Sequence, residues 1–346
     1  MGQQLIFSAP KQVGLEEYPD PPLQPTEVRV VTHFSGISAG TELTQYRGTN
    51  PYLQKHFDPE QRLFVDQPGL TYPLRGFGYQ QVGRIVEVGS KLREVQVGQM
   101  VWGSWGHRTH AILDWSLVSP KRLPQGANPL WGIFPRIGAI ALNPVHEANI
   151  HVGETVAIFG LGVIGLIAIQ LACLNGAAVI AVDRLDKRLE LARRLGADHV
   201  INFHNDDPAK TIKTLTRRGV DVSLELSGSY TALHEAIRAT AYNSKVVAAG
   251  FYQGEGLNLS LGEEFHHNRI QLISSQIQGI NPTLSHRWDR LRLEQTVMAL
   301  AIKGKIELLS LISHTFPAGE AAKAFELIDQ HSGETLQVVL DFREMS

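Results

Sequence analysis

Three glycines and one aspartate have the spacing of a dinucleotide-binding site. Gly160, Gly162 and Gly165 spell G-x-G-x-x-G, and Asp183 follows the last glycine by 18 residues (183 − 165). In such a site the glycines permit a tight turn, a close approach of backbone N–H groups to a pyrophosphate, and close packing of the next helix. The acid then binds a ribose 2′-hydroxyl. The pattern therefore predicts a bound dinucleotide.

The elements that would position this loop are present on both sides of it. Apolar residues 156–159 precede the glycines, and a helix-length stretch, residues 166–174, follows them. A second apolar run, residues 179–182, ends directly before the aspartate. Strand, loop, helix, strand and acid in this order are more specific than glycine spacing alone. Val163 and Ile164 lie at the start of the helix, where N–H groups and the positive dipole end would face the phosphates.

The aspartate also bears on the choice of cofactor. The Asp183 carboxylate would repel a 2′-phosphate, which favours NAD over NADP. Arg184 is adjacent and would either soften that repulsion or cover the adenine. Positions at the ends of later strands are predicted to contact the ribose and nicotinamide: Ser227, Gly250, Phe251 and Ser275.

Composition narrows the class of protein. The length of 346 residues suggests about two domains, and 43% hydrophobic with 19% charged residues is typical of a soluble globular protein. Lys and Arg (32) nearly balance Asp and Glu (34), so neither nucleic acid nor a membrane is expected as a partner. The single cysteine, Cys173, excludes an internal disulfide framework and a Cys-rich zinc site. Because the first residues lack a signal-peptide pattern, we expect a cytoplasmic location.

The N-terminal region and the rest of the chain differ in periodicity. Up to about residue 125 the sequence is typical of short strands between turns, most clearly at 27–32 and 81–88. Residues 49–75 are interpreted as an ordered excursion or lid, or else as a plain surface loop.

From residue 143 to 275 strand and helix patterns alternate. Alternation implies parallel pairing through right-handed crossovers, hence a doubly wound α/β sheet. The predicted helices are 185–195, 208–218 and 231–241, and the predicted strands are 199–202, 221–226, 245–249 and 270–275. The last segment predicts helices at 291–303 and 318–329 and a strand at 335–341. It is too short for a domain, so we expect it to return to the N-terminal unit.

Six ordered stretches resemble the medium-chain dehydrogenase/reductase superfamily, the relatives of zinc alcohol dehydrogenases, over nearly the whole chain. They are SGISAGTEL (35–43), GYQQVGRIVEVGS (78–90), VGQMVWG (97–103), HVGETVAIFGLGVIG (151–165), LGADHVIN (195–202) and FPAGEAAKAFELI (316–328). The resemblance implies a GroES-like β-rich catalytic domain, residues 1–142 and 281–346, split by a Rossmann domain, residues 143–280. It also implies an active site in the cleft between them and a homodimer formed through the sheet edge of the Rossmann domain.

The departures from the superfamily pattern concern zinc. Members with a catalytic zinc carry a Cys where this chain has Ser38 or Ala39, and a His-Glu pair where it has Tyr79 and Gln80. Their third ligand would fall near residues 135–137, which here are Pro, Arg and Ile. Zinc needs thiolate, imidazole or carboxylate donors. We therefore predict that no zinc is bound.

One stretch is similar to a zinc-lacking subgroup named for the bacteriochlorophyllide dehydrogenases, which oxidise a hydroxyethyl side chain. It is PGLTYPLRGFGYQQVG, residues 68–83, in which a Gly-Tyr pair stands where zinc-binding members have Gly-His. The similarity does not establish a tetrapyrrole substrate.

Without a metal, the chemistry needs a proton acceptor and a group that stabilises an alkoxide-like oxygen. Thr41 stands where the resemblance places the hydroxyl of a proton relay; the alternative is a turn-stabilising threonine. The Tyr79 phenol would donate to or accept from a carbonyl oxygen; the alternative is an aromatic ring that fills the space of the metal. Ser38 and Gln80 would supply further hydrogen bonds, Gln80 as a residue of the substrate pocket.

A cluster of aromatic residues and histidines follows in VWGSWGHRTH. Trp102, Trp105 and His107 are predicted to line the substrate pocket, with a solvated loop as the alternative.

These features together favour a zinc-independent NAD(P)-dependent oxidoreductase that interconverts a secondary alcohol and a ketone on a small-molecule substrate. One alternative is an NADPH-dependent quinone or enone reductase, which also lacks zinc. Another is a non-catalytic nucleotide-binding sensor.

Overall fold

The computed structural model describes residues 1–345 and divides into two compact units. Unit 1 comprises residues 1–136 and the segment that begins at Leu309, and unit 2 is Ile137–Leu308. The expected boundaries lay after residues 142 and 280, so the division differs at both places. Residues 281–308 belong to unit 2 because they pack there. Val297, for example, fills the space beside the bare Cα of Gly138.

Unit 2 is built on a six-stranded parallel sheet with the order β12-β11-β10-β13-β14-β15. Numbered along the chain this is 3-2-1-4-5-6, the order of dinucleotide-binding sheets. Its strands are β10 (Thr155–Phe159), β11 (Ala178–Asp183), β12 (His199–Asn202), β13 (Val220–Glu225), β14 (Thr240–Ala248) and β15 (Gln271–Ser274).

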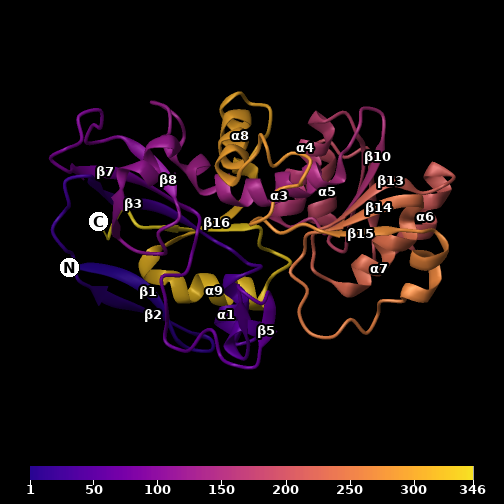
Figure 1. Cartoon of the computed structure of the whole chain (residues 1–346), viewed down its shortest axis with the longest axis horizontal. Coiled ribbons are helices and arrows are strands. Elements are labelled where there is room, and N and C mark those ends of the chain that lie inside the picture. The colour runs from indigo at the N-terminus through magenta and orange to yellow at the C-terminus, as the bar shows by residue number, and fades with distance from the viewer. Residues whose placement is uncertain (346) are drawn as a thin grey trace. The chain divides into compact units, whose positions relative to one another are not determined.

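Helices cover both faces of this sheet (Figure 1). α4 (Val163–Leu174) and α5 (Asp186–Arg194) lie on one face, and α6 (Pro208–Thr216) and α7 (Tyr230–Ala239) lie on the other. Apolar side chains of the strands, such as Ile180, are buried between the sheet and these helices. The predicted doubly wound α/β sheet is confirmed.

Some elements of unit 2 depart from the predicted pattern. α3 (Pro135–Ala148) was not predicted, because Pro144 inside it interrupts the helical sequence pattern. β14 begins directly after α7 rather than at 245. α8 (Arg290–Ile302) matches its predicted span, but it belongs to unit 2 and does not return to the N-terminal unit.

Unit 1 is β-rich, as predicted, and β3 (Glu27–Ile37) is its central strand. β3 pairs with β7 (Gln81–Val88), β9 (His110–Asp114) and β17 (Gln337–Asp341). Because β17 is the last strand of the chain, the end of the chain completes the sheet of the N-terminal unit, which confirms that part of the prediction. The other strands are β1 (Gly2–Ala9), β2 (Gln12–Tyr18), β6 (Leu74–Arg75), β8 (Met100–Gly103) and β16 (Ile312–Pro317).

Three α-helices lie in the described part of unit 1. α9 (Ala321–Gln330) places Phe325 in the core, with its ring centroid 5.1 Å from that of Phe7. α1 (Glu42–Arg47) and α2 (Trp115–Val118) are too short to show a helical period, and the sequence pattern does not predict them.

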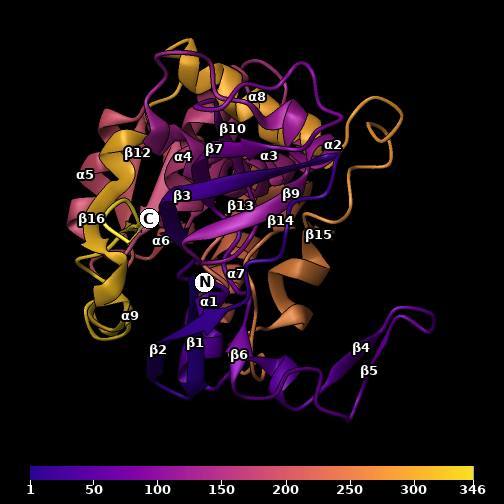
Figure 2. The same cartoon turned by 90° about the vertical axis from the view of Figure 1, so that its left-hand side faces the viewer.

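Residues 49–75 form an ordered excursion. They contain a hairpin of β4 (His56–Asp58) and β5 (Leu63–Val65), which Figure 2 shows projecting from the rest of unit 1. The Phe57 and Phe64 rings pack across it with centroids 5.2 Å apart. A function as a lid stays a prediction. Over the described residues 1–345, no helix combines the length and hydropathy that a membrane crossing requires.

Candidate active site

The predicted glycine loop joins β10 to α4. Gly160 has φ +90°, in the left-handed region that favours glycine. A Cβ on Gly165 would overlap the carbonyl oxygen of Gly160, so a side chain there would push the helix off the loop. Gly162 has nothing within 4 Å of the place of its Cβ. The space beside Gly162 is therefore unobstructed, and the first N–H groups of α4 follow it directly in the chain. They belong to Val163 and Ile164 and lack carbonyl partners within the helix.

Asp183 ends β11 and is fixed to the glycine loop. Its Oδ2 accepts a hydrogen bond from the Leu161 N–H at 2.7 Å. Its Oδ1 accepts from the N–H groups of Arg184 and Leu185 at 2.8 and 3.0 Å. Arg188 Nη1 lies 4.0 Å from Oδ2; burial lowers the pKa of Arg188, and the Asp183 charge opposes that shift. The carboxylate therefore stands beside the loop, and the side chain of Arg184 is exposed.

The loop after β13 meets the glycine loop where the strand order reverses. A Cβ on Gly160 would lie 2.7 Å from the Cβ of Ser227. Glu225, which the sequence pattern did not identify, is fully buried at the end of β13. Its carboxylate accepts from the N–H groups of Ser227 and Gly228 at 2.8 and 3.1 Å, and from the Tyr252 hydroxyl. Burial raises the pKa of the Glu225 carboxyl, and these hydrogen bonds oppose the shift.

The remaining predicted cofactor residues follow β14 and β15. A Cβ on Gly250 would overlap the backbone nitrogen of Gly228, so the two loops pack backbone to backbone. Phe251 is 46% exposed, and the Ser275 hydroxyl accepts from Asn143 Nδ2 at 3.0 Å. All the predicted cofactor residues thus lie at the carboxyl ends of the parallel strands or at the start of α4, where such sheets bind ligands. Their contact with a cofactor stays a prediction.

The three predicted catalytic residues meet in unit 1. Ser38 Oγ lies 2.5 Å from the Tyr79 hydroxyl, and the Thr41 side chain is near enough to lower the pKa of the phenol. Ser38 follows β3, Thr41 directly precedes α1, and Tyr79 precedes β7. Burial raises the pKa of Tyr79, the hydrogen bond with Ser38 lowers it, and the Glu42 charge raises it further. At neutral pH the side chain is therefore a phenol that can donate a proton.

His107 lies in a buried polar network. Its side chain is 0% exposed, with Nε2 2.7 Å from Glu42 Oε2 and Nδ1 2.6 Å from Ser35 Oγ. The alternative of a solvated loop is wrong for this residue. Sequence reasoning missed Glu42, Ser35 and Gln81. The available signal was strand alternation, because Ser35 and Gln81 face each other in the β3–β7 register.

The other predicted pocket residues have core positions. Trp105 packs in a core cluster with Val30, and its Nε1 donates to Thr32 Oγ1 at 2.9 Å. Trp102 is 3% exposed. Gln80 is 1% exposed, and its Oε1 would lie 3.0 Å from a Cβ on Gly36. These positions give the two tryptophans a structural role, and their contact with a substrate stays a prediction.

The residues at the positions of catalytic zinc ligands do not fit zinc. Ser38 and Tyr79 offer a hydroxyl and a phenol that are bonded to each other, and Gln80 offers an amide. None of these is a thiolate, imidazole or carboxylate.

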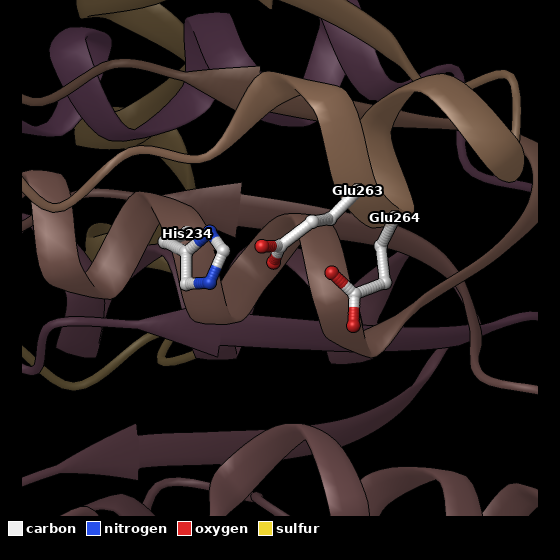
Figure 3. Close-up of side chains that lie close together, drawn as sticks. All are labelled: His234, Glu263 and Glu264. Carbon is white, nitrogen blue, oxygen red and sulfur yellow. The ribbon is translucent and has the colours of Figure 1, made fainter.

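A different group in unit 2 has the side-chain types of a metal site. Within residues 1–345, His234, Glu263 and Glu264 form the one group of three such side chains, with ligand atoms within 4.8 Å of one another. Figure 3 shows the three side chains directed toward one another. Arg238 Nε lies 3.5 Å from Glu264 Oε1. Because this carboxylate already has a cationic partner, we assign no metal to the group.

Known proteins resemble the chain over nearly its whole length. Residues 163–292 match the zinc-binding dehydrogenase family. D-guloside 3-dehydrogenase of Escherichia coli (strain K12) is 31% identical over 351 residues, which cover 98% of this chain and 100% of the relative. Two solved structures from Escherichia coli share the fold. An oxidoreductase/dehydrogenase of unknown specificity has TM-score 0.80 and 19% identity, covering 98% of this chain and 99% of its own. Galactitol-1-phosphate dehydrogenase has TM-score 0.79 and 21% identity, with the same coverage of 98% and 99%.

Proposed function

Because this chain belongs to the zinc-binding dehydrogenase family, whose medium-chain members are NAD(P)-dependent oxidoreductases, we propose that it interconverts a secondary alcohol and a ketone without a bound zinc. The hydroxyl cluster of Ser38, Thr41 and Tyr79 carries this proposal. It places three proton-bearing groups together at positions where zinc-dependent relatives need metal ligands and a proton relay. Since the named relatives are dehydrogenases, the non-catalytic alternative is not retained.

Unit 2 contains the residues that would hold the cofactor. The open side of Gly162 and the first N–H groups of α4 suit a pyrophosphate, and the fixed Asp183 carboxylate suits a ribose with a free 2′-hydroxyl. We therefore propose NAD as the preferred cofactor. When bound, it supplies the hydride acceptor for alcohol oxidation and, in reduced form, the hydride donor for ketone reduction.

Unit 1 contains the residues that would move the proton. In ketone reduction the Tyr79 O–H bond breaks and its proton forms the O–H bond of the alcohol product. The phenolate, to which the Ser38 hydroxyl 2.5 Å away donates a hydrogen bond, then regains a proton from solvent. Alcohol oxidation runs these transfers in reverse. A positioned acid or base of this kind contributes roughly 10²–10⁴-fold to a rate.

For the substrate we propose a sugar or polyol derivative with a secondary hydroxyl. The support is the D-guloside 3-dehydrogenase relative, which aligns with the chain from end to end at 31% identity.

A direct test combines kinetics with metal analysis on the purified full-length chain. We expect NAD-linked oxidation of a sugar or polyol in a panel of secondary alcohols, by protein that holds far less than one zinc per chain. One tightly bound zinc per chain, whose removal abolishes turnover, would overturn the zinc-free proposal. Rapid turnover of NADPH with simple quinones and no alcohol oxidation would instead establish the quinone or enone reductase alternative.

We also propose a homodimer formed through β15. This strand pairs only with β14 and so forms an edge of the described six-stranded sheet, and its Leu272 is 39% exposed. An unpaired edge with an apolar side chain favours pairing with a second copy. Leu272→Arg should give a monomer in light scattering while NAD affinity is kept. A dimer that persists in this variant would contradict the assignment.

A further inference from the structure

A line of buried hydrogen bonds in unit 1 orients the His107 ring. The backbone N–H of Trp105 can only donate, so the Gln81 side-chain atom 2.9 Å from it is the oxygen, Oε1. Gln81 Nε2 then donates to Ser35 Oγ at 2.9 Å. The Ser35 hydroxyl then directs its proton to His107 Nδ1, 2.6 Å away. Because a carboxylate oxygen can only accept, and Glu42 Oε2 lies 2.7 Å from Nε2, we take Nε2 as the ring nitrogen that carries the proton.

That protonated nitrogen faces a buried carboxylate. His107 Nε2 lies 2.7 Å from Glu42 Oε2, and the two side chains are 0% and 2% exposed. The other oxygen, Oε1, accepts from the Ser38 N–H at 3.1 Å. Burying a carboxylate is costly unless donors of this kind surround it. An apolar pair at positions 42 and 107 would fill the same space without that cost, so packing alone does not account for these residues.

Ser38 connects this pair to Tyr79. Its backbone N–H bonds Glu42, and its hydroxyl bonds the phenol. The charged and polar groups that shift the pKa of the phenol are Ser38, Glu42, Thr41 and Arg136. Burial is the largest influence on the pKa of Tyr79. Of these four groups, Glu42 alone raises this pKa, whereas the other three lower it. Glu42 thus acts on Tyr79 both through its charge and through the position of Ser38.

We propose, on the basis of the proposed function, that Glu42 is a positioning residue, held by His107, that keeps Tyr79 protonated until the substrate oxygen takes its proton. His107 fixes the carboxylate, the carboxylate fixes Ser38, and Ser38 fixes the direction of the phenol hydrogen bond. The role concerns the proton and not the cofactor, so it can be examined in the free protein.

The ionisation of Tyr79 can be followed by phenolate absorbance. The chain has eight tyrosines, so each spectrum is compared with that of the same protein carrying Tyr79→Phe. Glu42→Gln removes the charge but keeps an acceptor for the Ser38 N–H, and it should lower the Tyr79 midpoint by roughly one pH unit. Ser38→Ala keeps the Glu42–His107 pair but removes a hydrogen bond that lowers the pKa, so it should raise the midpoint. Glu60→Gln neutralises an exposed carboxylate of the same unit and is the matched control.

A midpoint that is the same in Glu42→Gln and in the wild type, or a shift that Glu60→Gln reproduces, would overturn the inference. If Glu42→Gln does not fold, nitrogen NMR of the His107 ring in the wild-type protein still decides the arrangement: we expect the Nε2–H tautomer, and the Nδ1–H tautomer would contradict it. The proposed function fails separately. If Tyr79→Phe keeps full alcohol oxidation while the midpoint shift is observed, the catalytic assignment is wrong and the positioning role stands. If Tyr79→Phe abolishes turnover and the midpoint does not move, only the positioning role is wrong.

Discussion

The glycine loop of unit 2 and the hydroxyl cluster of unit 1 are built in opposite ways. The loop offers backbone N–H groups to a ligand. The residues that shape it lie in one short stretch of sequence and are Gly160, Gly165 and Asp183. The cluster consists of side chains from separate segments, joined by hydrogen bonds between Ser38 and Tyr79 and between His107 and Glu42. A backbone site constrains residue types at fixed spacings, whereas a side-chain site depends on which strands become neighbours. Substitutions should therefore damage the first by steric overlap and the second by loss of a proton.

The largest expected effect is steric and belongs to the loop. Gly165→Ala would place a methyl group against the Gly160 carbonyl oxygen, and should cost about 2–4 kcal/mol in the free energy of unfolding and weaken NAD binding. Gly162→Ala meets nothing within 4 Å and should change stability by less than about 1 kcal/mol. Urea unfolding and calorimetric NAD titration of both variants measure the difference. Equal stabilities would show that the close approach at Gly165 does not constrain the loop.

A smaller effect, confined to turnover, is expected in the cluster. Tyr79→Phe keeps the ring and removes the hydroxyl that Ser38 contacts at 2.5 Å. We expect kcat to fall by about 10²-fold, because a general acid is lost, with NAD affinity unchanged. Steady-state kinetics and cofactor titration separate the two quantities. A parallel loss of NAD affinity would show that Tyr79 also contributes to cofactor binding.

The third effect concerns cofactor choice. Asp183→Asn removes the charge that would repel a 2′-phosphate and keeps an oxygen for the Leu161 N–H. The ratio of kcat/KM for NAD to that for NADP should fall by about tenfold, a change of about 1.4 kcal/mol. Asp186→Asn, an exposed aspartate nearby, is the control. An unchanged ratio in Asp183→Asn would remove this residue from the cofactor site.

The smallest effect is a pH dependence of stability in unit 2. Burial, followed by the charges of Arg292 and Arg287, lowers the pKa of His146 from its ordinary value of 6.5 to about 4. The unfolded chain therefore takes up a proton at this residue before the folded chain does. Stability should be unaffected above pH 6.5 and fall as the pH drops toward 4, by about 1 kcal/mol after allowance for solvent screening. His146→Gln should flatten this part of a curve of thermal unfolding against pH, and an unchanged slope would contradict the assignment.

The same contrast explains how much could be predicted from sequence. The strands and helices of unit 2 repeat a strong hydrophobic period, and most of their spans agree with the predictions. α1 was not predicted because a six-residue helix shows too little period, although it carries Glu42. The resemblance placed Ser38 or Ala39, and Tyr79, at positions of zinc ligands, and the structure brings Ser38 and Tyr79 into contact. The pairing of His107 with Glu42 was not expected, since the two residues are 65 positions apart in the sequence and meet only in the folded chain.

Glu225 has a consequence for how quickly a cofactor can exchange. One buried carboxylate holds the N–H groups of Ser227 and Gly228 and the hydroxyl of Tyr252, so the loops after β13 and β14 share a single anchor. The conformational entropy of these two loops is therefore lost when the chain folds, and it need not be lost again when a ligand binds. A cofactor that binds to these loops would therefore meet a preorganised surface. Its departure then requires no segment of either loop to unfold.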